Sequence, residues 1–262
     1  MNVDSQIVGH RIIVIQSLQQ NDKTTGSELF HDILQYKEYF QNDTFSKFYE
    51  VKNKEDFLSL IHNICESIID GETITLHFET HGGDKGVILQ STEIISWEEF
   101  DNAVRPINIK TKNLLVVVMA MCKGGALLSH IDPEKRCPYL AFVGSVRDVN
   151  EEEIIESFNA FYSNYNSPLD ISKAMNSLRN YFDSVCEKTP FGCFSADYIF
   201  DNTFDVNRDK QYFHWLIELY SYKKYGDCAD RHREDTEKEI HDILNHTLAQ
   251  RDYFLFKDVY NE

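Results

Sequence analysis

The most apolar stretch of the chain, LLVVVMAM at residues 114–121, constrains the fold more than any other feature. It is rich in β-branched residues and far shorter than the ~20 apolar residues of a membrane span. A strand that is apolar on both faces is typical of the centre of a parallel sheet with helices on both sides. Further strands are expected at residues 11–18, 45–51, 73–79 and 139–146, with a short β-arm at 86–89.

Amphipathic segments alternate with these strands, which predicts an α/β sandwich with a mostly parallel sheet. Ser27 is the expected N-cap of one helix, and Ser96 with Glu99 matches the capping box of another. The remaining expected helices of this region cover residues 56–70, 151–165 and 172–182.

The alternation weakens after residue 182. Residues 186–208 are expected to be irregular, and two helices are expected at 211–224 and 236–250. We therefore expect a domain over residues 1–185 and a helical C-terminal extension over 186–262 that packs on it.

The charge balance excludes some functions. The 262-residue chain has 26 Lys and Arg against 43 Asp and Glu, a net charge of −17. Direct nucleic-acid binding and attachment to an anionic membrane are disfavoured, because both depend on basic residues. The acidity suits a cationic substrate, although it also serves solubility. The six cysteines form no CxxC pair and the N-terminus has no signal-peptide pattern, which favours the cytoplasm and free thiols.

Two reactive residues follow the predicted central strands directly. His81 comes after TITLHFET and precedes Gly82-Gly83, and Cys122 comes after LLVVVMAM and precedes Lys123-Gly124-Gly125. The carboxyl ends of parallel strands are where α/β sheets hold catalytic groups. A thiol beside an imidazole is the minimum apparatus for covalent acyl transfer. The backbone N–H groups of Gly82 and Cys122 are candidates for the oxyanion hole.

The order and spacing of these motifs resemble the caspase-like cysteine peptidases. In that family a strand ending in His-Gly precedes, by about fifty residues, a hydrophobic strand ending in Cys-x-Gly. Here MAMCKGG (119–125) is similar to the caspase pattern Gln-Ala-Cys-x-Gly. The stretch FVGSVRDVNEEEIIESFNAFY (142–162) resembles the CHAT and separase branch, although Arg147 and Asn150 stand where that branch usually has Trp and Asp. The resemblance covers about residues 8–182.

The resemblance implies a caspase-like three-layer αβα sandwich and a cysteine endopeptidase. Cys122 would be the nucleophile and His81 the general base and acid. In the separase-like branch, acidic residues after the next strand recognise a basic P1 residue, which points to Asp148 and Glu151. Two alternatives stay open here: Arg147 would suit an acidic P1 residue, and the run Glu151–Glu153 also suits the start of a helix.

The resemblance also bears on partners and regulation. A protein substrate and a regulatory protein or ligand are expected, and bacterial members of the family often act as defence effectors. The connection at residues 129–138 is short for a cleavable linker, so we expect activity as an uncut chain. We expect no cofactor and no metal, because Cys186, Cys193 and His214 lack zinc-site spacing.

Purely structural roles for Cys122 and His81 are the alternatives to a catalytic Cys122–His81 dyad. Cys122 could be a small core residue and His81 a loop residue. His77, within a strand, and His130, beyond the cysteine, are interpreted as structural. The main alternative is a catalytically inactive binding or scaffold module on the same fold, and a second is an unrelated α/β ligand-binding domain of flavodoxin type. A phosphate loop is not indicated, because no Lys-Ser/Thr follows Gly124-Gly125.

Overall fold

A computed structural model of the chain describes residues 7–40, 43–204, 210–226 and 231–260. The chain divides into two compact units. The first comprises residues 1–131 and 137–195, and the second comprises residues 132–136 and 196–262.

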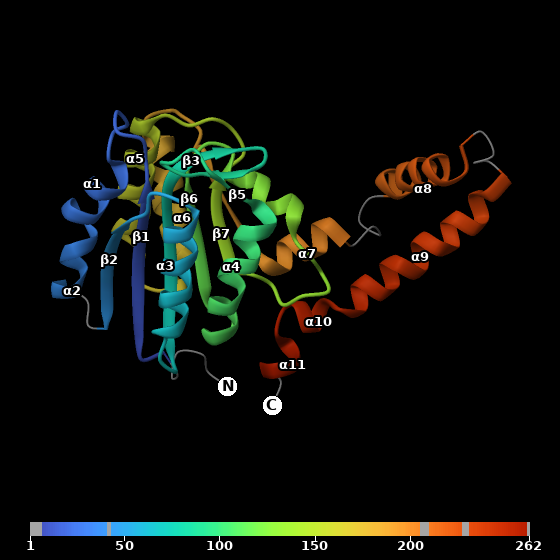
Figure 1. Cartoon of the computed structure of the whole chain (residues 1–262), viewed down its shortest axis with the longest axis horizontal. Coiled ribbons are helices and arrows are strands. Elements are labelled where there is room, and N and C mark those ends of the chain that lie inside the picture. Colours follow the sequence, from blue (N-terminus) through green and yellow to red (C-terminus); the bar gives the residue numbers. More distant parts are fainter. Residues whose placement is uncertain (1–6, 41–42, 205–209, 227–230, 261–262) are drawn as a thin grey trace. The chain divides into compact units, whose positions relative to one another are not determined.

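The first unit contains a mixed, mostly parallel sheet (Figure 1). Its main strands run in the order β2-β1-β3-β6-β7-β8, and only β8 is antiparallel to its neighbour. The predicted apolar strand is β6, which lies between β3 and β7 and is fully buried. The main strands are β1 (Gly9–Ser17), β2 (Thr44–Glu50), β3 (Glu72–Gly83), β6 (Leu115–Ala120), β7 (Ala141–Ser145) and β8 (Phe191–Ser195).

Helices cover both faces of this sheet, as the apolar strand composition predicts (Figure 1). Alternate residues of β3 show the two sides. His77 packs edge-on against Phe158 of α5, with ring centroids 4.7 Å apart, and Phe78 packs against Phe100 of α4 at 5.0 Å. Helices α1 (Thr25–Asp32), α5 (Glu151–Ser163) and α6 (Ile171–Ser184) share the side of His77, and α3 (Lys54–Glu66) and α4 (Trp97–Lys110) share the side of Phe78. Shorter helical elements are η2 (Leu34–Tyr36), α2 (Lys37–Phe40), η3 (Gly124–His130) and η4 (Pro168–Asp170).

The two predicted helix starts have different outcomes. The capping box of α4 is confirmed: Ser96 Oγ accepts the N–H of Glu99, and the Glu99 carboxylate accepts the N–H of Ser96. The prediction of Ser27 as an N-cap is wrong. Helix α1 begins at Thr25, so Ser27 lies inside it and donates its N–H to the Gln16 side chain at 3.0 Å. The helix ends at Asp32, because the backbone leaves helical geometry at Ile33 (φ −127°).

The prediction that residues 186–208 are irregular is wrong for 191–204, which form β8 and helix α7 (Ala196–Phe204). Residues 186–190 contain no helix or strand, and 205–208 lie outside the described residues. Phe194 of β8 stacks on Phe142 of β7, with centroids 5.9 Å apart, while Phe191 belongs to the core on the α5 side. Strand β8 therefore extends the sheet beyond residue 185, and the compact first unit ends at Ser195.

The second unit consists of helices, as expected for the C-terminal extension. Both predicted helices are present, as α8 (Lys210–Tyr225) and α9 (Arg233–Ala249), followed by α10 (Arg251–Phe254) and α11 (Lys257–Tyr260). Within this unit, Arg251 of α10 forms an ion pair with Asp201 of α7 at 2.6 Å. That the extension packs on the sheet stays a prediction. Among the described helices of the chain, none combines the length and the hydropathy that a membrane crossing requires.

Candidate active site

The parallel pairing of β3 and β6 brings the two predicted catalytic residues to one edge of the sheet. The register ends with Glu79 opposite Ala120, and His81 and Cys122 each follow two residues later. The predicted β-arm is also present. Strand β4 (Gly86–Ile88) turns back on the end of β3, with Ile88 opposite His81, and then pairs with β5 (Ile94–Ser96). His81 is thus part of a hairpin that extends from a central strand.

The backbones of the two motifs approach each other closely at Gly82. A Cβ atom added at Gly82 would lie 2.2 Å from the carbonyl oxygen of Cys122 and 2.9 Å from Met121 Cγ. No side chain fits in that space, so the close approach requires glycine. The arrangement brings Gly82 and Cys122, the two expected oxyanion-hole residues, into contact.

Asp22 is a partner of His81 that the sequence analysis did not identify. It lies in the loop between β1 and α1, and its Oδ2 atom is 2.8 Å from His81 Nε2. The N–H of Gln19 donates to the same oxygen at 2.7 Å. A carboxylate only accepts hydrogen bonds, so Nε2 carries the hydrogen and Nδ1 is the nitrogen that can take a proton. The signal was available, since QQND (19–22) begins two residues after the end of β1, whose carboxyl end adjoins that of β3.

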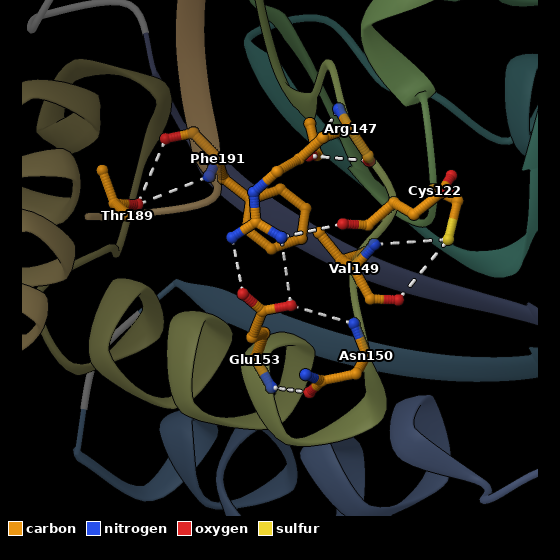
Figure 2. Close-up of polar contacts among 9 residues, drawn as sticks. Cys122, Arg147, Val149, Asn150, Glu153, Thr189 and Phe191 are labelled. Carbon is orange, nitrogen blue, oxygen red and sulfur yellow. Dashed lines mark hydrogen bonds and ion pairs between the residues drawn. The ribbon is translucent and has the colours of Figure 1, made fainter. Parts of the chain in front are cut away.

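Cys122 is half-buried, and the loop between β7 and α5 holds its sulfur (Figure 2). The Val149 N–H donates to Sγ, and the thiol donates to the Val149 carbonyl, both at 3.4 Å. Lys123 has a left-handed backbone (φ 53°) and donates its N–H to the Arg147 carbonyl at 3.0 Å. Of the residues that the structure describes, only Val149 makes a hydrogen bond to this sulfur, so Sγ is not bonded to His81 here.

The Arg147 side chain, from the same loop, makes polar contacts with Asp148 and Glu153 (Figure 2). Its guanidinium forms an ion pair with Glu153 at 2.5 Å and donates to the Asp148 carbonyl at 2.8 Å. The hydrogen bond from Arg147 lowers the pKa of Glu153 and raises that of Arg147. Glu153 also completes the capping box of α5 with Asn150. Arg147 therefore anchors the loop to the start of the helix.

His81 and Cys122 line one cavity of about 580 Å³. Its carboxylates outnumber its amines, and of the two predicted S1 residues it includes Glu151 only. Asp148 is exposed and lies outside the described lining. The charged or titratable lining residues are Asp22, Lys23, Glu79, His81, Cys122, Glu151 and Glu152.

A buried polar network lies beneath this cavity. Glu79, only 1% exposed, contacts His77 Nε2 at 2.9 Å and accepts the Thr25 hydroxyl at 2.7 Å. The other His77 nitrogen is 3.1 Å from the Tyr162 hydroxyl, and burial raises the pKa of Tyr162, which therefore keeps its proton. His77, predicted to be structural, thus lies in a polar network with Glu79, which was not predicted from the sequence. The alternation of Thr75, His77 and Glu79 along one face of a buried strand was the available signal.

His130 and Cys193 are not among the residues that line this cavity. His130 is exposed at the end of η3. Burial raises the pKa of Cys193 to about 11, which disfavours the thiolate that a metal would need. Within the described residues, no group of three or more His, Cys, Asp or Glu side chains is arranged to hold a metal ion.

Comparisons with known proteins give no family for this chain. No protein-family model matches it, and no curated protein is significantly similar to it.

Proposed function

We propose that this chain is a caspase-like cysteine endopeptidase, nearest to the CHAT and separase branch, with Cys122 as nucleophile and His81 as general base and acid. The observation that carries the proposal is the cavity of about 580 Å³ that both residues line, in which Asp22 orients the His81 ring. A thiol, an imidazole and a carboxylate that converge on one cavity are the components of a cysteine-peptidase triad.

The proposed reaction has two stages. His81 Nδ1 takes the proton of the Cys122 thiol, and the thiolate adds to the scissile carbonyl. The N–H groups of Gly82 and Cys122 stabilise the resulting oxyanion. The C–N bond then breaks, the amine leaves with the proton from His81, and a thioester remains. In the second stage, His81 takes a proton from water, the hydroxide attacks the thioester, and Cys122 is released with the acid product. The Val149 contacts of Sγ must open before this sequence starts, and such rearrangement is common between free and substrate-bound enzymes.

We further propose cleavage after a basic residue. The carboxylates of the cavity favour a cationic side chain, and the ion pair with Glu153 occupies the arginine that would suit an acidic one. Of the two proposed S1 residues, Glu151 has the stronger support because it lines the cavity. Asp148 would contribute only if the loop moved.

Regulation by a partner protein or ligand and a role in bacterial defence belong to the same proposal, and they rest on the motif resemblance alone. A cytoplasmic location belongs to the same proposal and is supported by the cysteine pattern, which contains no CxxC pair. A protein substrate follows from the proposed activity.

The test is labelling and turnover with peptides that carry a P1 Arg. A chloromethyl ketone of this type should modify Cys122, as mapped by mass spectrometry, and a fluorogenic peptide should be cleaved.

Cys122→Ala and His81→Ala should each abolish cleavage, and the double variant should be no worse, because the two residues act as one unit. Asp22→Asn should reduce kcat by about 10²-fold with little change in KM, since general acid–base catalysis contributes 10²–10⁴-fold. Wild-type turnover by Cys122→Ala would contradict the mechanism.

One observation favours the second candidate, a catalytically inactive binding module. In the structure, Cys122 Sγ forms hydrogen bonds with the Val149 backbone and not with His81. In such a module Cys122 would resist the chloromethyl ketone even when the ligand or partner is bound. Labelling that depends on His81 would exclude this candidate.

A further inference from the structure

Two buried lining residues of the cavity face each other across the central strands. Glu79 of β3 lies opposite Ala120 of β6, both line the cavity, and each is only 1% exposed. We call this pair the floor. Each member precedes the candidate catalytic residue of its own strand, His81 or Cys122, by two positions. Two residues of a strand span about 7 Å, so the floor lies one long side chain below the dyad.

Glu79 has capacity for a further hydrogen-bond partner. Its carboxylate contacts the Thr25 hydroxyl and the His77 ring, and a carboxylate has about four acceptor positions. Within the described part of the chain, no lysine or arginine forms an ion pair with it. Lys23, the one lysine of the lining, lies with its ammonium 3.5 Å from Glu28. A carboxylate buried to this degree is stabilised by an opposite charge that arrives with good geometry.

The rest of the lining fits the shape of a long cationic side chain. Ala120 is small and leaves space beside Glu79, while Leu18, Met121 and Ile154 provide apolar walls. Lysine and arginine have an aliphatic stem that packs on apolar surface and a charged end that needs acceptors. Glu151, exposed at the start of α5, adds a further negative charge to the lining.

We propose that Glu79 is the specificity-determining residue of the cavity and that it binds the guanidinium or ammonium of a P1 Arg or Lys. This inference rests on the proposed function and deepens it, because it moves the recognition of P1 from the loop residues Asp148 and Glu151 to the floor. An acidic P1 side chain would be repelled by Glu79, and a short neutral one would not reach it.

The test compares two peptides that differ only in P1, arginine or its uncharged isostere citrulline. The wild type should cleave the Arg peptide with the higher kcat/KM, by about 10- to 100-fold, which is the contribution of a hydrogen bond to a charged group. Glu79→Gln keeps the size of the side chain and removes its charge, so it should lose most of this ratio. Glu156→Gln, an exposed position of α5 outside the cavity lining, is the matched control and should keep it. An Arg-to-citrulline ratio that survives Glu79→Gln overturns the proposal.

A binding measurement separates this inference from the peptidase proposal. Agmatine has the guanidinium and stem of arginine without a scissile bond. It should bind the wild type in calorimetry and bind Glu79→Gln at least about tenfold more weakly. If agmatine binding depends on Glu79 but no peptide is cleaved and Cys122 is not labelled, the floor assignment stands and the peptidase proposal fails. If peptides with a neutral P1 are cleaved best and agmatine does not bind, the floor assignment fails and the peptidase proposal stands.

A second variant keeps the test decisive if Glu79→Gln does not fold. Ala120→Leu fills the space beside Glu79 and leaves the hydrogen bonds to Thr25 and His77 in place. It should abolish agmatine binding, because the guanidinium can no longer reach the carboxylate. Undiminished agmatine binding by a folded Ala120→Leu chain would contradict the proposal.

Discussion

His10 is a buried histidine in β1 whose neutral form the fold requires. Its ring contacts the hydroxyls of Thr73 at 2.7 Å and Thr75 at 3.3 Å, and it packs edge-on against Tyr165. Burial lowers the pKa of His10 to about 3. The unfolded chain, with a histidine pKa near 6.5, therefore binds one more proton than the native state between these two values.

This difference predicts that the protein loses stability on acidification below pH 6.5. Stability rises with pH wherever the unfolded state binds more protons, so His10 contributes fully above pH 6.5 and its contribution decreases toward pH 3. The loss at pH 5 is about 2 kcal/mol relative to pH 7. Urea unfolding at the two pH values measures it. His10→Gln cannot be protonated, so its loss should be smaller by about this amount, and an equal loss would contradict the assignment.

At the level of elements, the β3 hairpin and the loop after β6 pack closely against each other. A side chain at Gly82 would collide with the Cys122 carbonyl at 2.2 Å, whereas at Gly83 the nearest atom, Ile88 Cδ1, is at 3.6 Å. Gly82→Ala should therefore force the two backbones apart, with an overpacking cost of about 1–3 kcal/mol. Its melting temperature and the rate of Cys122 labelling should both fall. Gly83→Ala is the matched control and should change neither, and equal effects of the two variants would contradict this account.

The sequence predicts the strands better than it predicts the loops and edges. The strand that contains 114–121 was recognisable because burial on both faces requires continuous apolar residues. Strand β8 was missed because its five residues, FGCFS, include a glycine and are held in place by pairing with β7, which is distant in sequence. The Ser27 cap failed for a similar reason, since the N–H of Ser27 is bonded to Gln16 of β1.

The candidate site shows the same division. His81 and Cys122 were predictable because each directly follows a recognisable strand, and parallel pairing aligns strand ends. Asp22 and Glu79 were not predicted, because their importance depends on which strands are neighbours. Strand β1 lies next to β3, and only this order brings the loop of Asp22 to His81. Local patterns identify elements, whereas sheet order determines which of their ends meet.

At the scale of the whole chain, the segment 132–136 is notable because it belongs to the second compact unit although it follows the candidate nucleophile closely in sequence. Within that unit, the Arg136 guanidinium lies over the rings of Tyr253 at 4.0 Å and Phe256 at 4.8 Å and forms an ion pair with Asp258. Hydrogen bonding to Arg136 lowers the pKa of Asp258. This clamp holds residues 132–136, which lie within the short connection 129–138 that follows the candidate nucleophile.

The clamp supports the expectation that the chain acts uncut, and it makes cleavage of this connection depend on local opening. Proteolysis of a native chain follows the population of the opened segment. Replacing both Tyr253 and Asp258 by alanine leaves the sequence 132–136 unchanged, so a Glu-specific protease should cut after the exposed Glu134 several-fold faster than in the wild type. Asp252→Ala, which removes only an exposed pair with Lys257 at 3.9 Å, is the control. Equal cleavage rates in all three proteins would show that the clamp does not restrain the segment. Recovery of peptidase activity only from a chain split within residues 129–138 would show that cutting is part of its activation.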